Sequence, residues 1–189
     1  MIGAITAGML SGGTPVATNS YESIATVTVG AGGSSTITFS SIPSTYKHLE
    51  LRAISRDGGG SNDFATPKFT FNSDTSSTYP RHYLYGNGSA ASAGSVPTTG
   101  FAYIGTIAQG GTPANTFTPM VVDILDYANT NKYKTVRSLS GGETNSIGAV
   151  SFVSALWQST SAITDISITS SSATNFAQYT TFALYGIKG

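Results

Sequence analysis

Residues 123–136 read DILDYANTNKYKTV and contain two strand-like runs on either side of a short polar segment, ANTN, at residues 128–131. Asparagine is common in turns because its side chain hydrogen-bonds to the nearby backbone. The pattern therefore predicts a β-hairpin whose loop is residues 128–131. In the register that this loop sets, Lys134 lies opposite Leu125.

The same stretch concentrates charge in a chain of which only 10% of the residues are charged. Asp123, Asp126, Lys132 and Lys134 lie within it, and Arg137 follows directly. Opposite charges on adjacent strands stabilise their pairing by roughly 0.2–1 kcal/mol. We therefore interpret the cluster as fixing the hairpin register, with Lys134 near both carboxylates. A catalytic acid pair of Asp123 and Asp126 is the disfavoured alternative, because the hairpin already explains both residues.

Alternation of polar and apolar residues continues on both sides of this hairpin. In KHLELRAIS (residues 47–55), Leu49 and Leu51 point to one face, while Glu50 and Arg52 point to the other. About ten or eleven strands of this kind can be counted, and no window has a helical period. We therefore predict an all-β fold, an antiparallel two-sheet sandwich that is jelly-roll-like and carries an extended N-terminal arm.

Two further segments give local predictions. SIATVTV (residues 23–29) and STITF (residues 35–39) are joined by a glycine-rich turn, which predicts that they pair as a first hairpin. NGSAASAGSVPTTG (residues 87–100) consists mostly of small residues and is predicted to be a long loop, either mobile or in contact with another chain.

The chain divides into an extended arm, residues 1–20, and a β-sandwich domain, residues 21–189. The arm is small, glycine- and threonine-rich and uncharged, which is untypical of a packed element. The arm is expected either to contact a neighbouring subunit or to pack on its own domain. Contacts with other chains are expected first from the arm and then from the long loop. The residues proposed for these contacts are Ile2, Ile5, Met9, Leu10, Pro15, Val16, Asn87, Val96 and Pro97.

Composition excludes several classes of function. The formal net charge is zero and no run of Lys and Arg could follow a phosphate backbone, so nucleic-acid binding is not expected. The sequence contains no stretch of about 18 apolar residues, so no transmembrane helix is predicted and no membrane partner is expected. So few charges also weaken the usual protection against association. One interpretation is that other chains cover much of the surface.

The sequence offers little for catalysis or metal binding. It contains no cysteine, and its two histidines, His48 and His82, are far apart and are interpreted as surface or interface residues. No G-x-S-x-G nucleophile motif precedes a helix. We therefore predict no catalytic residue, no metal site, no cofactor and no enzymatic activity.

Two features have a functional and a structural interpretation. DGGGSND places Asp57, Asn62 and Asp63 in a glycine loop, but glycines occupy the positions that would supply the alternating oxygen ligands of a calcium loop, and a plain turn is favoured. Exposed Tyr and Asn residues and Trp157 could bind a sugar, but the apolar surroundings of Trp157 in FVSALW favour a place in the core.

Four segments together resemble a known group of proteins. They are ITFSSIPSTYKHLELR (37–52), ILDYANTNKYKTV (124–136), ALWQSTSAITDISI (155–168) and FALYGIKG (182–189). In content and order they resemble small β-sandwich virion structural proteins of tailed bacteriophages. The resemblance runs from about residue 21 to the C-terminus and does not include the arm.

The resemblance implies a non-enzymatic protein, because this family carries no catalytic residues. It implies either a capsid decoration (cement) protein or a domain of a tail fibre or tail tip. The chain has no coiled-coil heptads and no repeated shaft segment, which favours the decoration protein. The expected partners are then the major capsid protein and copies of the chain itself, as a homotrimer on the capsid surface of the virion. Under the tail alternative, the ligand is a host surface glycan.

Overall fold

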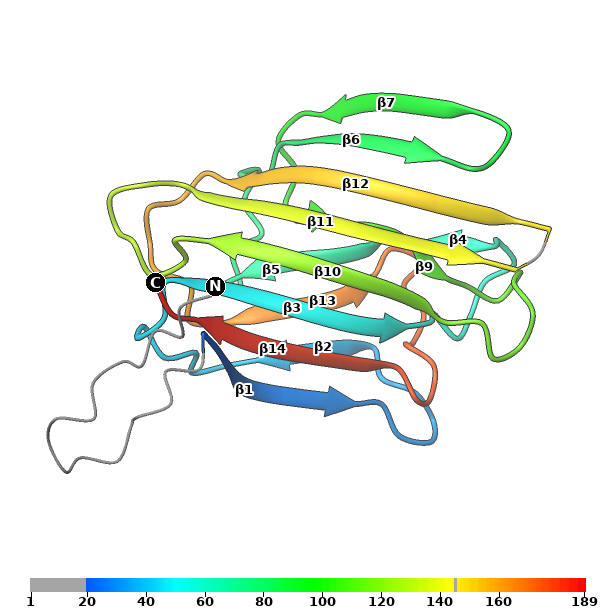
Figure 1. The fold of residues 1–189 in the computed structure, drawn as a ribbon, viewed down its shortest axis with the longest axis horizontal. Helices are drawn as coiled ribbons and strands as arrows, with labels where there is room; N and C mark the ends of the chain where they lie inside the picture. Colours follow the sequence, from blue (N-terminus) through cyan, green and yellow to red (C-terminus); the bar gives the residue numbers. More distant parts are fainter. Residues whose placement is uncertain (1–19, 145) are drawn as a thin grey trace, which may run out of the picture.

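The computed structural model describes residues 20–144 and 146–189, and these residues form strands and connections without any helix. No helix in this part of the chain could therefore cross a membrane. Figure 1 shows the strands, labelled in chain order. They are β1 (Tyr21–Thr28), β2 (Thr36–Phe39), β3 (His48–Ser55), β4 (Phe64–Ala65), β5 (Pro67–Phe71), β6 (Arg81–Gly86), β7 (Ala91–Val96), β8 (Ala102–Tyr103), β9 (Ile107–Ala108), β10 (Thr118–Leu125), β11 (Lys134–Glu143), β12 (Gly148–Trp157), β13 (Ile166–Ser170) and β14 (Thr181–Ile187).

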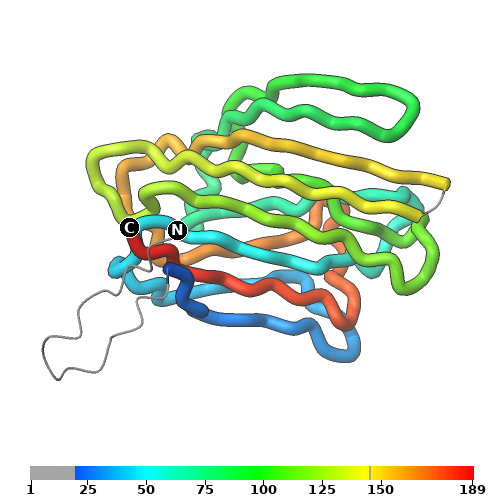
Figure 2. Tube along the Cα trace, in the orientation of Figure 1, coloured from blue at the N-terminus to red at the C-terminus, as the bar shows by residue number. Residues whose placement is uncertain are grey.

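The strands form two main antiparallel sheets. The larger sheet has eight strands in the order β1-β14-β3-β10-β11-β12-β6-β7, and the smaller has four in the order β2-β13-β5-β8. β4 and β9 form a separate pair. The chain passes repeatedly from one sheet to the other, and the two sheets lie face to face (Figures 1 and 2). The predicted all-β, antiparallel sandwich is confirmed.

The core lies between the sheets and follows the alternation of the strands. Leu49 and Leu51 of β3 belong to the same core cluster as Phe69 and Phe71 of β5, and all four side chains are inaccessible to solvent. Trp157 packs against Phe71 and Tyr79 in this core. Its ring is buried, and its Nε1 donates a hydrogen bond to Asp74 Oδ2 at 2.7 Å. The core interpretation of Trp157 is confirmed.

The hairpin predicted from residues 123–136 is present, as β10 and β11, but its register differs by one residue. Leu125 lies opposite Thr135, not Lys134. Asp126 adopts a left-handed backbone conformation (φ 50°) where the chain leaves β10, and this starts a longer loop than the four residues predicted. Because a shift of one residue exchanges the faces of a strand, Lys134 points into the protein and is fully buried.

The predicted pairing of residues 23–29 with 35–39 is wrong. β1 pairs with β14 in the large sheet, whereas β2 pairs with β13 in the small one. The connection between them is a crossover, because its backbone bonds to a distant segment: Val29 N donates to Thr180 O, and Ser34 and Phe176 bond to each other. That segment comes from the C-terminal part of the chain, so local sequence could not reveal it.

The prediction of a long loop over residues 87–100 is also wrong. Residues Ala91–Val96 form β7, which pairs with β6 in an unbroken register. The two strands meet in a tight turn at Gly88, where φ is +84° and the Asn87 side chain accepts hydrogen bonds from the backbone N–H groups of Ser89 and Ala90. Alanine, serine and glycine have low strand propensity, which hid the strand.

Candidate interaction surface

The outer face of the eight-stranded sheet carries a row of apolar side chains that crosses five neighbouring strands. Val121 lies opposite Leu139, Leu139 opposite Phe152, Phe152 opposite Leu84, and Leu84 opposite Ala93. The four larger side chains are 41–58% exposed. Strand pairing thus brings together residues that are far apart in the sequence.

A second apolar row runs beside the first, two residues further along each strand. Ile54 lies opposite Pro119, and Val150 lies opposite Gly141 on one side and Gly86 on the other. Ile54 is 51% exposed and Val150 59%. We call the two rows together the apolar band. Its members are Ile54, Leu84, Ala91, Ala93, Pro119, Val121, Leu139, Val150 and Phe152.

A row of charged and polar residues borders the band on one side, and Glu143 lies two residues beyond Gly141 on the other. The next row along the strands begins with Glu50 opposite Asp123 and continues through Arg137, Ser154 and His82. The apolar band itself contains no charged residue. Polar residues therefore flank an apolar centre, as at the rim and core of a protein interface.

Arg52 closes the first apolar row at the side of β3. Its Nε lies 2.6 Å from Glu50 Oε1, and its guanidinium lies 5.7 Å from the ring centres of both Tyr21 and Tyr185. Glu50 also accepts a hydrogen bond from the Tyr21 hydroxyl at 3.0 Å, which raises the pKa of that hydroxyl. These contacts hold the Arg52 guanidinium beside the band.

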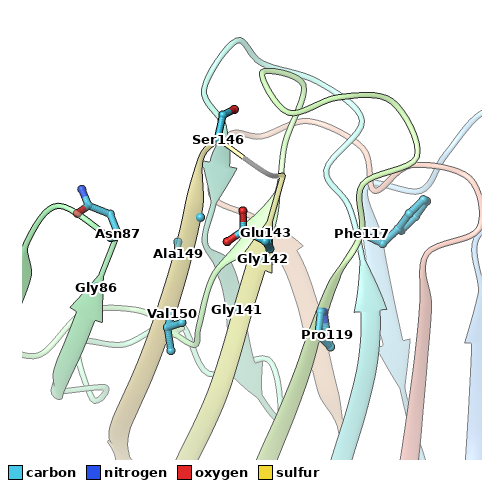
Figure 3. Close-up of a pocket in the computed structure, with 12 residues that line it drawn as sticks. Gly86, Asn87, Phe117, Pro119, Gly141, Gly142, Glu143, Ser146, Ala149 and Val150 are labelled. Carbon is cyan, nitrogen blue, oxygen red and sulfur yellow. The ribbon is translucent and has the colours of Figure 1, made fainter.

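At least four hollows interrupt the face, and two of them reach β6. One, of about 470 Å³, is lined by residues of the band and its border, among them Leu84, Phe152 and His82. The other, of about 730 Å³, lies where β10, β11 and β12 approach the β6–β7 turn, and Figure 3 shows Asn87 and Glu143 among the residues that line it. Both are open depressions, which suits contact with a surface.

The sequence-predicted contact residues fall in different places. Asn87 lies at the exposed β6–β7 turn beside the larger hollow. Val96 ends β7 and is half-buried, and the exposed Pro97 follows it. The arm residues lie outside the described part of the chain; they are Ile2, Ile5, Met9, Leu10, Pro15 and Val16.

The charged cluster of the hairpin separates into two structural roles. Asp126 contacts Lys47 at 3.2 Å and Lys132 at 2.5 Å, and hydrogen bonds from Lys132 and Lys47 lower its pKa from 3.8 to about 2. Lys134 instead lies beneath the loop, and Asp123 lies opposite Arg137 on the sheet face. Asp123 therefore lies on the opposite face of the sheet from Lys134, which contradicts that part of the prediction, whereas the charge of Asp126 acts on Lys134 and opposes the lowering of its pKa by burial.

The remaining candidates for chemistry lie in structural settings. Asp57 is buried, and its carboxylate accepts hydrogen bonds from Gly59 N, Ser170 and Thr174. His48 accepts a hydrogen bond from the backbone N–H of Asp126, and three strands separate β3 from the strand that carries His82. Over residues 20–144 and 146–189, no three His, Cys, Asp or Glu side chains gather as a metal site would require.

Sequence reasoning missed the apolar band, although one signal was available. In TPMVVDIL of β10, part of the strand is apolar on both faces. An antiparallel strand with one solvent-exposed face should instead alternate apolar and polar residues. No protein-family model matches the chain, and no curated protein and no solved structure matches it either. The band is therefore interpreted from its own geometry.

Proposed function

We propose that this chain is a non-enzymatic virion structural protein of a tailed bacteriophage, a decoration protein that binds the capsid surface and stabilises the head. The resemblance of four sequence segments supports a virion origin. The apolar band supports surface binding, and it is the observation that carries the proposal. The partners are the major capsid protein and further copies of the chain, with a trimer as the expected assembly.

The band differs from the usual surface of an antiparallel sandwich, whose outward positions are polar. Six side chains, each at least 41% exposed, lie in two adjacent rows without a charge among them. Contiguous apolar patches of this kind mark interaction sites. The large side chains are Ile54, Leu84, Val121, Leu139, Val150 and Phe152.

The energetics suit a protein that binds in many copies. Covering about 400 Å² of apolar surface contributes roughly 10 kcal/mol at about 25 cal/mol per Å². Association costs about 4–15 kcal/mol in lost translational and rotational freedom, so a single copy would bind weakly. Symmetric repetition on a capsid, or linkage within a trimer, multiplies such contacts without any new one.

The tail alternative has less support from the geometry. Glycan binding uses exposed aromatic faces, but Trp157 is only 2% exposed, and the exposed tyrosines, Tyr21, Tyr133 and Tyr179, lie outside the apolar band. Phe152 is the one aromatic residue of the apolar band. A flat aliphatic surface fits a protein partner better than a sugar.

Co-sedimentation with phage heads that lack this protein tests the proposal. The wild-type protein should pellet with the heads, and Leu139→Lys should lose most of that binding because it puts a charge in the middle of the band. Thr26→Lys is the matched control: Thr26 is exposed in β1 and lies opposite Ala183, in the same cross-strand row but away from the band. Failure of the wild-type protein to bind would contradict the proposal, and equal binding by Leu139→Lys would contradict the role of the band.

A further inference from the structure

The outer edge of β7 is the feature that carries a further inference. β7 is the last strand of the eight-stranded sheet, and within the described ranges no strand pairs with its outer side (Figure 1). Its sequence, ASAGSV, contains no charge and no proline, and its register with β6 has no bulge. Edge strands normally carry charges, prolines or bulges, because these features prevent pairing with another chain.

The opposite edge of the sheet shows this protection. β1 has a register shift between Ser23 and Ala25, which disrupts its edge. It also carries Glu22, whose carboxylate lies 2.8 Å from Lys188 Nζ. The two edges of one sheet therefore differ, and only β7 is regular and uncharged.

The phase of the hairpin shows which backbone groups of β7 point outward. Asn87 N donates to Ala90 O at 3.1 Å, which makes this the first bonded pair of the antiparallel hairpin. Bonded and non-bonded pairs then alternate along the ladder. The pairs that contain Ala91, Ala93 and Ser95 are non-bonded, so the N–H and C=O groups of these three residues point away from β6.

The side chains of β7 leave room for another strand. On the outer face of the sheet, β7 presents only methyl and hydroxymethyl groups, from Ala91, Ala93 and Ser95. On the other face Gly94 lies against the Tyr83 ring, where an added Cβ would come within 2.6 Å of the hydroxyl oxygen. A strand so narrow allows a neighbour to approach to the ordinary spacing of about 4.8 Å.

We propose that β7 pairs with β7 of a second copy of this chain, antiparallel and about a two-fold axis perpendicular to the sheet. Such an axis requires a residue to lie opposite itself. With Ala93 at the axis, Ala91 of each copy lies opposite Ser95 of the other. All three residues whose backbone groups point away from β6 then form bonded pairs, and each pair exchanges two hydrogen bonds. With Gly94 or Ser92 at the axis, only two such pairs form.

A second copy fits this edge better than an unrelated strand because the contact continues the apolar band. The two-fold axis keeps the outer faces of both sheets on the same side. The first apolar row ends at Leu84 and Ala93, so the rows of the two copies would meet at β7 and form one surface. β7 contains no charged residue, so the pairing places no like charges opposite each other. The inference does not rest on the proposed capsid function. If the chain also forms a trimer through other surfaces, this contact would double the number of chains in the assembly.

Cysteine cross-linking tests the proposed register, because the natural chain has no cysteine. Ala93→Cys should form a disulfide dimer on mild oxidation, since the two Cα atoms would lie within the range of about 4.4–6.8 Å that a disulfide spans. Ser95→Cys is the control, because its two copies would be about 13 Å apart along the strands. Rapid cross-linking of Ala93→Cys alone is the expected result. Equal cross-linking of both variants, or none, would overturn the register.

Light scattering after size-exclusion chromatography tests the contact itself. Ala93→Pro removes one outward N–H without removing a bond to β6, as proline at a free edge allows, so it should halve the mass of the wild-type assembly. Ala93→Thr keeps the N–H and should keep the wild-type mass. A wild-type monomer, or an Ala93→Pro protein of unchanged mass, would overturn the proposal.

Discussion

Lys134 is a fully buried charge that holds the loop between β10 and β11. Its Nζ donates hydrogen bonds to the carbonyl oxygens of Asn129 at 2.6 Å, Lys132 at 2.8 Å and Thr160 at 3.2 Å. Burial lowers the pKa of the ammonium group, and the carbonyl oxygens replace the water that it loses. One side chain thereby connects the hairpin tip to the segment that follows β12.

The first prediction concerns this residue. Lys134→Met should lower the free energy of unfolding by about 2–4 kcal/mol, because hydrogen bonds to charged groups are strong and the carbonyls would remain buried without a donor. Lys132→Met is the control. Its side chain is 57% exposed and forms a surface ion pair with Asp126, so the loss should stay below about 1 kcal/mol. Urea denaturation measures both, and equal losses would contradict the assigned role.

The second prediction concerns pH and Asp126. Lys132 and Lys47 lower its pKa from 3.8 to about 2, so the folded state holds this proton less tightly than the unfolded state. The corresponding stability is present above the unfolded pKa and is lost as the pH falls from 3.8 towards 2. Asp126→Asn should therefore lose less stability than the wild type over this range. Parallel acid-unfolding curves for the two proteins would argue against the ion pairs.

At the scale of the strand, the third prediction tests which face is buried. Leu51→Ala should cost about 2–5 kcal/mol, because Leu51 is in the core and its truncation leaves a cavity. Leu139→Ala removes the same atoms from the outer face, where the side chain is 57% exposed, and should cost less than about 1 kcal/mol. Equal costs in chemical denaturation would show that the free protein already covers the band.

The strands themselves were predictable wherever alternation was strong, and their pairing was less so. Period-two patterns located β3 and the β10–β11 hairpin, since side chains that face the core must alternate. The partner of β1 was not predictable, because it lies at the other end of the chain. The register of β10 with β11 depended on the φ of Asp126, which no pattern encodes.

The surface was harder to predict than the core. β7 was missed because its alanine, serine and glycine residues show no alternation of polarity, although Asn87-Gly88 is a strong signal for a hairpin turn. The apolar band requires the registers of five strands at once. Sequence could suggest that the chain is covered by others, from its low charge, but not which face is covered.

For the whole molecule, the proposal predicts that the protein strengthens the head. Phage particles made without it should release their DNA at a lower temperature than wild-type particles, because fewer contacts join neighbouring capsid subunits. Adding purified wild-type protein should restore the release temperature, and Leu139→Lys should not. Fluorescence of a DNA-binding dye during heating measures the release. Identical profiles with and without the protein would show that it does not stabilise the head.

The most direct test is the number of copies in each virion. Quantitative mass spectrometry of purified phage particles can scale this chain to the major capsid protein of the same particles. A decoration protein repeated over the capsid lattice should be present in hundreds of copies, in a fixed ratio to the capsid protein. A few to a few tens of copies would contradict a capsid location and assign the apolar band to a contact in the tail.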